Sequence, residues 1–179
     1  MNFSFDPFPV LQTSRLLLRN FSKDDYAQVF FLRSDKEVNS YIKRVYPKKI
    51  EEAIAFVDKV QSSMKNGENV NWAICQKEDL KMMGSICLWN FSSDLKTGEV
   101  GYDLHPDFQN RGYMGEAMKA VLRFGFEELQ LDHIKAFTHH SNESSKKLLK
   151  NNGFVLLPDE KDVDNKDNII LCLSKHQVK

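Results

Sequence analysis

The chain is poor in cysteine, and its 3 cysteines among 179 residues share no CxxC spacing. Cys75, Cys87 and Cys172 each lie in an apolar run that is typical of a strand. Isolated thiols in such runs behave as small hydrophobic side chains. The sequence therefore predicts neither a disulfide framework nor a thiolate metal site, and a covalent cysteine mechanism is disfavoured.

An excess of one charge is also missing, because 25 basic residues balance 25 acidic ones. No global field then draws the protein to nucleic acid or to an anionic membrane. Nowhere do about 18 apolar residues follow one another, and the first residues lack the basic and apolar segments of a signal peptide. We therefore expect a cytoplasmic protein without a nucleic-acid or membrane partner.

Linkers, repeats and low-complexity runs are absent as well. The chain has only 5 prolines and 8 glycines, and they do not gather into a flexible segment. A length of 179 residues is enough for one well-buried α/β core. The sequence therefore predicts a single domain over residues 1–179.

The most informative segment is residues 109–117, which place two glycines at the start of an amphipathic helix. A strand is predicted over residues 99–105, and Pro106 ends it because proline cannot donate to a ladder. Apolar residues at helical spacing follow: Met114, Ala117, Met118, Val121, Leu122, Gly125 and Leu129. The first amides of a helix lack partners and its dipole is positive there, so the turn predicts a phosphate site.

Three phosphate or nucleic-acid loops share part of this pattern. A Walker loop has Lys-Ser/Thr after its last glycine, whereas Gly115 is followed by Glu116 and Ala117. The dinucleotide fingerprint has three glycines early in a βαβ unit, whereas two stand here, late in the chain. Residues 112–115 match the GXXG of a KH domain, but four residues are a weak signal and the balanced charge opposes RNA binding.

Residues 109–114, Gln-Asn-Arg-Gly-Tyr-Met, resemble the acetyl-CoA motif of the GNAT acetyltransferases, Gln/Arg-x-x-Gly-x-Gly/Ala, with methionine in the last position. A second block, residues 142–154, is similar to the family's Asn-x-x-Ser segment that ends in Gly-Phe. A third, residues 13–19, is similar to the opening strand of the branch that contains the ribosomal-protein N-terminal acetyltransferases. The three blocks span nearly the whole chain and imply an acetyl-CoA-dependent N-acetyltransferase.

The order of elements predicts an α/β fold with a mixed, mainly antiparallel sheet. The expected strands are residues 11–21, 70–76, 81–91, 99–105, 134–139, 154–157 and 169–174. The expected helices are residues 23–34, residues 50–66, the helix after Gly112, and one that Ser141 or Asn142 caps and Gly153 ends. In the resembled GNAT fold, strands 4 and 5 of about seven splay apart, about four helices flank the sheet, and pantetheine enters the gap.

The resemblance implies which residues bind acetyl-CoA. Backbone groups of Asp103, Leu104 and His105 would pair with pantetheine as another strand does. The pyrophosphate would be held at Gln109, Asn110, Arg111, Gly112, Tyr113, Met114 and Gly115. Asn142 would cap its helix through its backbone and reach pantetheine through its side-chain amide, and Arg111, Lys146 and Lys147 are candidates for the 3′-phosphate.

The reaction implied is direct attack of an amine on the thioester, without a covalent enzyme intermediate. Glu99, at the head of the strand that bends toward the thioester, is the first candidate for the base, and Asp103 or His105 could replace it. Ser145 stands where the family has its serine and is the candidate proton donor to the CoA thiolate. A serine at this place also suits a helix cap.

Two adjacent histidines, His139 and His140, are of a residue type that often binds metal ions. Neighbouring residues of a strand point to opposite faces, so we expect that the two do not chelate together, and we predict no metal. The favoured acceptor is the N-terminal α-amino group of a ribosomal protein, with polyamines, amino acids and antibiotics as alternatives. A non-catalytic acetyl-CoA sensor and an RNA-binding module are the rival functions, and the fold is compatible with a homodimer.

Overall fold

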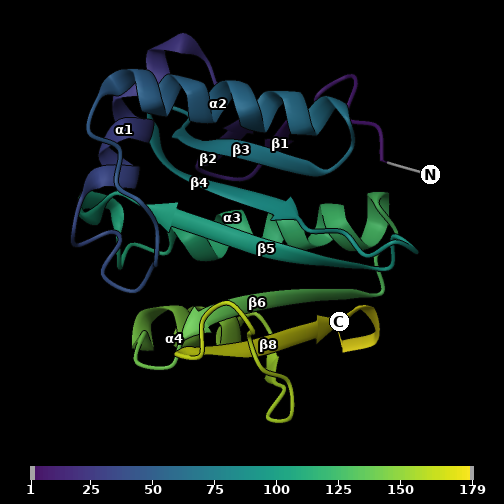
Figure 1. The fold of residues 1–179 in the computed structure, drawn as a ribbon. Coiled ribbons are helices and arrows are strands. Elements are labelled where there is room, and N and C mark those ends of the chain that lie inside the picture. Colours follow the sequence, from purple (N-terminus) through teal and green to yellow (C-terminus); the bar gives the residue numbers. More distant parts are fainter. Residues whose placement is uncertain (1–2, 178–179) are drawn as a thin grey trace.

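Eight strands form one sheet in the structure, a computed structural model that describes residues 3–177 (Figure 1). Their order across the sheet is β1-β2-β3-β4-β5-β6-β8-β7, and of the paired neighbours only β5 and β6 run parallel. The strands are β1 (Leu11–Gln12), β2 (Leu16–Arg19), β3 (Asn69–Gln76), β4 (Met82–Trp89), β5 (Thr97–Leu104), β6 (His133–His139), β7 (Val155–Leu156) and β8 (Asn168–Ser174). The expected mixed, mainly antiparallel sheet is confirmed.

Four α-helices accompany the sheet among the described residues: α1 (Tyr26–Ser34), α2 (Ile50–Lys65), α3 (Tyr113–Arg123) and α4 (Glu143–Asn151). A short 3-10 helix, Lys23–Asp25, precedes α1, and a π-helical turn, Phe124–Glu128, continues α3. No helix within residues 3–177 is long and apolar enough to cross a membrane.

The two faces of the sheet carry separate hydrophobic cores because successive strand residues point to opposite sides. In β3, Trp72 and Ile74 pack in the core that contains Met118 of α3. Ala73 and Cys75 pack instead with residues of α1 and α2, Val29 and Val57 among them. Helices α1 and α2 therefore cover one face of the sheet and α3 the other (Figure 1).

The prediction of one strand over residues 11–21 is wrong. Residues 11–19 form a hairpin instead, in which Leu11 of β1 pairs with Leu18 of β2 and the Thr13 amide donates to the Leu16 carbonyl at 3.0 Å. Residues 13–15 form the turn of this hairpin, and their polar groups bind Glu116 of α3.

The parallel pairing of β5 with β6 is confined to their first residues. Thr97, Gly98 and Glu99 are in register with His133, Ile134 and Lys135, and the ladder stops there. Strand β6 then continues antiparallel to β8 over its whole length, and β5 continues antiparallel to β4. The expected splay between these two strands is confirmed, and Figure 1 shows them diverging.

Asn142 caps the start of helix α4 and Gly153 follows its end, as predicted. The Ser145 amide donates to the Asn142 side-chain oxygen at 3.0 Å, so the side chain makes the cap, where a backbone cap was expected. Gly153 has φ of +86°, the left-handed conformation that suits glycine at a helix end.

Candidate active site

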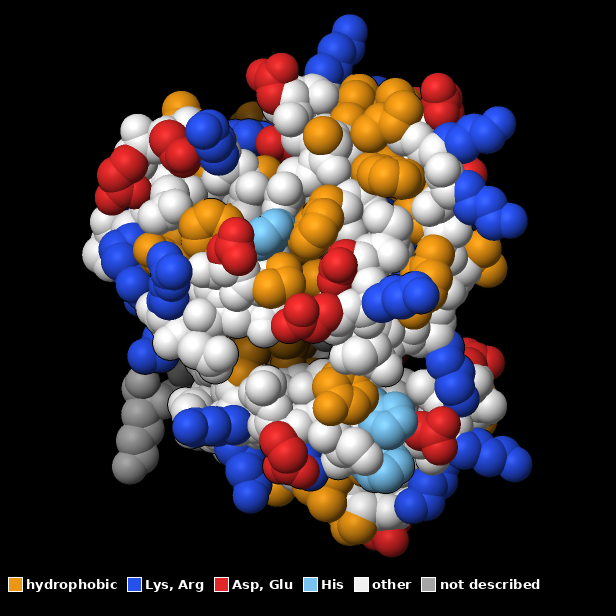
Figure 2. All heavy atoms as spheres, turned by 90° about the vertical axis from the view of Figure 1, so that its left-hand side faces the viewer, with side chains coloured by type: hydrophobic (Ala, Val, Ile, Leu, Met, Phe, Trp, Pro, Cys, Tyr) orange, Lys and Arg blue, Asp and Glu red, His pale blue; other side chains and the backbone are white. Residues whose placement is uncertain are grey.

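Two cavities lie against β5 and share two of its residues, Tyr102 and Asp103. The first, of about 700 Å³, lies under α1 and α2 and is called the α1–α2 cavity below. The second, of about 740 Å³, is lined by the end of β5, the start of α3, the start of α4 and residues 37–42, and is called the splay cavity. Figure 2 shows a cleft with hydrophobic side chains at its bottom on the side of the molecule toward which β5 points.

The glycine-containing turn takes the geometry of an anion site. Asn110 has φ of +58° and Gly112 φ of +79°, so left-handed residues alternate with ordinary ones before α3 starts at Tyr113. The first hydrogen bond of the helix runs from the Glu116 amide to the Gly112 carbonyl, at 3.0 Å. The amides that precede Glu116 therefore have no acceptor within the helix. Six predicted residues line the splay cavity here: Gln109, Asn110, Gly112, Tyr113, Met114 and Gly115.

These features suit the diphosphate of acetyl-CoA, and the cavity extends from them to the end of β5. Arg111 is the exception in the loop: its side chain is exposed and does not line the cavity. Of the lysines suggested for the 3′-phosphate, Lys147 lines the cavity, whereas the Lys146 ammonium pairs with Glu143 at 2.7 Å.

Glu116 fastens the N-terminal hairpin to the first turn of α3. Its carboxylate accepts from the Thr13 and Ser14 hydroxyls, from the Arg15 amide at 2.9 Å and from Arg15 Nε at 2.7 Å. The Arg15 guanidinium also lies 4.4 Å from the centre of the Tyr113 ring. Burial alone would raise the pKa of Glu116, but the bonds from Thr13, Arg15 and Ser14 lower it to about 2. The block at residues 13–19 thus supports the glycine-containing turn at residues 109–115, called the anion loop below.

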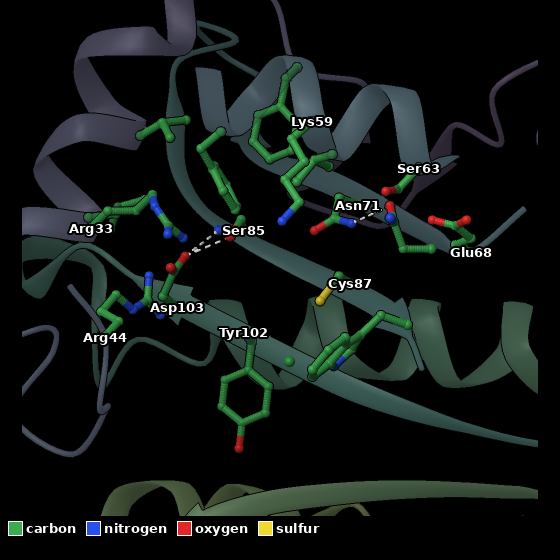
Figure 3. A pocket seen from close by; sticks show the side chains of 18 of the residues that line it. Arg33, Arg44, Lys59, Ser63, Glu68, Asn71, Ser85, Cys87, Tyr102 and Asp103 are labelled. Carbon is green, nitrogen blue, oxygen red and sulfur yellow. Dashed lines mark hydrogen bonds between the residues drawn. The ribbon is translucent and has the colours of Figure 1, made fainter. Parts of the chain in front are cut away.

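Two hydroxyl groups meet across the splay. Tyr102 of β5 points toward β6 and away from the α1–α2 cavity (Figure 3), and its Oη lies 2.7 Å from Ser145 Oγ of α4. Ser145 is only 8% exposed, and both residues line the splay cavity. Burial raises the pKa of Tyr102 to about 12, against the opposing effect of the Ser145 hydrogen bond. Both hydroxyls are therefore protonated at neutral pH.

One face of β5 carries two carboxylates with a glycine between them. Glu99, Gly101 and Asp103 alternate with the residues that face α3, so they share the face turned to α1 and α2. Asp103 lines the α1–α2 cavity and accepts from the Ser85 amide at 3.1 Å and the Ser85 hydroxyl at 2.7 Å. Burial raises the pKa of Asp103, opposed by Ser85 and by the charges of Arg44 and Arg33.

Glu99 lies at the rim of this cavity, outside the residues that line it. Asn90, which does line the cavity, donates to Glu99 Oε1 at 2.6 Å. Burial raises the pKa of Glu99 too, opposed by the Asn90 bond. Each carboxylate is thereby a better proton acceptor than an exposed one.

His105 has a structural role at the end of β5. Its Nδ1 accepts from the Asp107 amide at 3.2 Å, its ring stacks on Phe31 at 4.5 Å, and its amide donates to the Met83 carbonyl at 2.8 Å. His105 lines neither cavity, whereas Asp103 and Leu104 line the splay cavity. The structure thus separates His105 from the other predicted residues of this strand.

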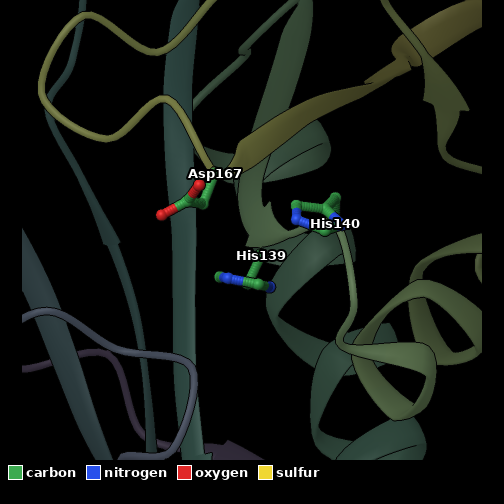
Figure 4. A group of neighbouring side chains, drawn as sticks. All are labelled: His139, His140 and Asp167. Atoms are coloured by element: carbon green, nitrogen blue, oxygen red, sulfur yellow. The ribbon is translucent and has the colours of Figure 1, made fainter.

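The expectation that His139 and His140 point apart is wrong. Their rings stack with centres 4.6 Å apart, and possible ligand atoms of His139, His140 and Asp167 lie within 4.8 Å of one another (Figure 4). The alternation rule fails because β6 ends at His139 and His140 begins a turn. Asp167 is already paired, with the Lys43 ammonium at 3.1 Å.

Several residues of the site were not predicted from the sequence. Tyr102 stands at a position that strand alternation assigns to the core. Arg33 lies in helix α1 and Arg44 in the loop before α2, and neither belongs to a motif. Glu116 enters the sequence analysis only as a residue that departs from the Walker pattern. An acidic residue in the first turn of a phosphate-binding helix is the one signal that could have drawn attention, because it opposes the anion unless it is paired.

Comparison with known proteins agrees with the geometry. The family model of the acetyltransferase (GNAT) domain matches residues 15–155. YnaD of Bacillus subtilis, an uncharacterised N-acetyltransferase, is 32% identical over 145 residues, which are 80% of this chain and 81% of that one.

Solved structures share the fold at lower identity. The ribosomal-protein-S5-alanine acetyltransferase of Vibrio fischeri has a TM-score of 0.80 at 20% identity, covering 96% of this chain and 99% of that one. RimL, a ribosomal L7/L12 α-N-protein acetyltransferase in complex with coenzyme A, has a TM-score of 0.81 at 15% identity, covering 93% and 98%. With the family model matched over most of its length, the chain belongs to the GNAT family of acetyltransferases.

Proposed function

We propose that the chain, acting as a single domain, moves the acetyl group of acetyl-CoA directly to a primary amine. The observation that carries this proposal is that the splay cavity and the α1–α2 cavity share Tyr102 and Asp103. A thioester held in the splay cavity and an amine held in the α1–α2 cavity would meet at this point of β5. The amine nitrogen bonds to the acetyl carbonyl carbon, the C–S bond breaks, and CoA leaves as a thiolate that takes up a proton.

The first acceptor class to test is the N-terminal α-amino group of a protein, ribosomal proteins included. RimL and the S5-alanine acetyltransferase are named for such acceptors, and both share this fold. An α-amino group with a pKa of about 7.8 is neutral about one time in seven at pH 7, whereas a lysine is neutral about once in 2,500. The α-amine therefore needs less help from a base.

The site residues have these roles in the proposal. The loop of Gln109, Asn110, Gly112 and the first α3 amides binds the diphosphate, and Lys147, which lines the splay cavity, is the candidate for a further phosphate. Glu99 takes the amine proton through water at the rim of the α1–α2 cavity. Ser145, hydrogen-bonded to Tyr102, supplies the proton to the thiolate.

The experiment is acetyl-CoA turnover, followed by thiol release, on N-terminal peptides, lysine peptides, polyamines, amino acids and aminoglycosides. We expect turnover on N-terminal peptides that is strongly reduced in Glu99→Gln and Ser145→Ala. Glu127→Gln, which changes an exposed residue after α3, should keep it. Tight CoA binding without turnover of any amine would overturn the proposal and favour an acetyl-CoA sensor.

A further inference from the structure

The α1–α2 cavity carries an excess of positive charge. Five charged side chains line it, and three of them are cationic: Arg33, Arg44 and Lys59, against Asp103 and Glu68. Figure 3 shows the two arginine side chains approaching Asp103 from two sides and Lys59 descending from α2, while Glu68 lies at the other end beside Ser63 and Asn71. The end of the cavity next to the shared residues is therefore the cationic end.

The two arginines lack the partners that the chain's other half-buried arginines have. Arg15 pairs with Glu116 and Arg19 with Asp25, each at 2.7 Å. Within residues 3–177, the guanidinium groups of Arg33 and Arg44 make neither a hydrogen bond nor an ion pair, although both side chains are partly buried. Asp103 is one carboxylate facing two guanidinium groups, and its hydrogen bonds go to Ser85, so one positive charge is left without a counter-ion. A partly buried cation without a counter-ion is unfavourable, so the cavity has a place for an anion.

The positions of the two groups suit an anion of oxygen atoms. The Arg33 guanidinium carbon lies 3.6 Å from the centre of the Phe56 ring, which fixes the plane of the guanidinium at the wall of the cavity. Burial and the neighbouring Arg44 lower the pKa of Arg33 to about 10, so Arg33 is still charged at pH 7. Paired guanidinium groups match carboxylate and phosphate oxygens in number and geometry.

The charged groups also limit where the acceptor's anion lies relative to its amine. The amine is expected over Gly101, where the side chain is absent and Glu99 and Asp103 flank it. Two strand residues, or roughly 7 Å, separate this point from the Asp103 position that Arg33 and Arg44 flank. In the acceptor, a short chain of covalent bonds between the amine and the anion spans that distance.

We infer that the acceptor is an anionic amine, with a carboxylate or phosphate group roughly 7 Å from its amino group, which Arg33 and Arg44 bind. The inference rests on the proposed acetyl transfer and names the chemical class of its acceptor. A small amine with such a group and a peptide with an acidic residue next to its N-terminus share this chemistry.

The test uses pairs of acceptors that differ only in the anion. The pairs are 3-aminopropyl phosphate with 3-aminopropanol, 5-aminopentanoate with 5-aminopentanamide, and amidated peptides with Glu or Gln at their second position. We expect kcat/KM of the intact protein to favour the anionic member of at least one pair by about 10–100-fold, mainly through KM. The pair that shows the preference identifies the source of the anion.

Arg33→Gln and Arg44→Gln should each reduce this preference to about 3-fold or less, as expected when one charge-assisted contact is lost. The ratio within a pair is the readout, because either change also alters the charge near Asp103. Lys48→Gln removes one exposed charge from the same loop as Arg44 but lies outside the cavity, and it should keep the preference. The affinity for CoA in each variant reports that the protein is folded.

Equal kcat/KM within every pair would overturn this inference and leave acetyl transfer standing. A preference that survives in both arginine variants would also overturn it. No turnover of any member would contradict the proposed function itself, and this inference with it.

Discussion

Tyr102 Oη and Ser145 Oγ lie 2.7 Å apart and join β5 to α4 across the splay of the sheet. The contact is part of the splay cavity, where the sulfur of acetyl-CoA would lie. A tyrosine with a pKa of about 12 keeps its proton at neutral pH and can pass it on through the serine. In the proposed mechanism the two residues would act together as the proton donor.

Removing either hydroxyl should therefore slow the chemical step. We expect Ser145→Ala and Tyr102→Phe each to lower kcat by about 10–100-fold, the lower part of the range for general acids. The double variant should lose less than the product of the two, because the groups act together. Steady-state kinetics with acetyl-CoA checks this, with Ser62→Ala on the exposed face of α2 as control. Full activity in Tyr102→Phe would show that Ser145 acts alone or not at all.

The pH profile distinguishes the two carboxylates of β5. Burial raises the pKa of Glu99, so the acid limb of kcat/KM should lie above the ordinary range of a glutamate. Glu99→Gln should abolish that limb and lower kcat/KM by about 10²–10⁴-fold, while Asp103→Asn keeps the limb. The reverse pattern would assign the base to Asp103, whose pKa is raised by burial as well.

Glu116 is expected to affect both stability and acetyl-CoA binding. Its folded pKa of about 2 lies below the ordinary 4.5, so it contributes stability above about pH 4.5 and loses it as the pH falls toward 2. Glu116→Gln should cost about 1–3 kcal/mol of unfolding free energy at pH 7 and less at pH 3. It should also raise KM for acetyl-CoA, because the anion loop loses its support. Denaturant titrations measure the unfolding free energy, and steady-state kinetics measures KM. Glu128→Gln, which changes an exposed residue beyond α3, should alter neither quantity.

Replacing Asp25, which lines neither cavity, should affect stability. It is 2% exposed and pairs with Arg19 at 2.7 Å, and the Arg19 and Ser22 bonds lower its pKa although burial alone would raise it. Asp25→Ala should cost about 3–5 kcal/mol, because it leaves a partly buried guanidinium unpaired. Its neighbour Asp24 is exposed, and Asp24→Ala should change the unfolding free energy by about 0.5 kcal/mol or less. Equal losses in urea unfolding would contradict this account.

Local signals predicted most of the fold. The strand, turn and helix around Gly112 and the two ends of α4 follow from proline, glycine and asparagine at fixed offsets, and the structure has them. The hairpin at residues 11–19 could not be predicted in this way. Its turn binds Glu116, about 100 residues away, and hydrophobic alternation carries no trace of that partner.

The site was predictable where a motif marked it. The residues of the anion loop other than Arg111 lie together at one cavity. No motif marks Tyr102, because alternation gives the face of a strand and not the gap beside it. Arg33 and Arg44 are brought together by the packing of α1 and α2 over β5, which periodicity does not describe. His139 and His140 show the converse, because alternation was applied one residue past the end of its strand.

Since β5 and β6 pair over only three residues, the sheet contains a strand edge in its interior. Unpaired backbone along an outer edge invites other chains to add to the sheet and aggregate. Here the edge faces α4 and β6 inside the molecule, so a slender chain of atoms can lie along it and a foreign strand cannot. The unpaired backbone groups of β5 are thus available to a ligand inside the molecule, and they are not exposed to strands of other copies of the chain.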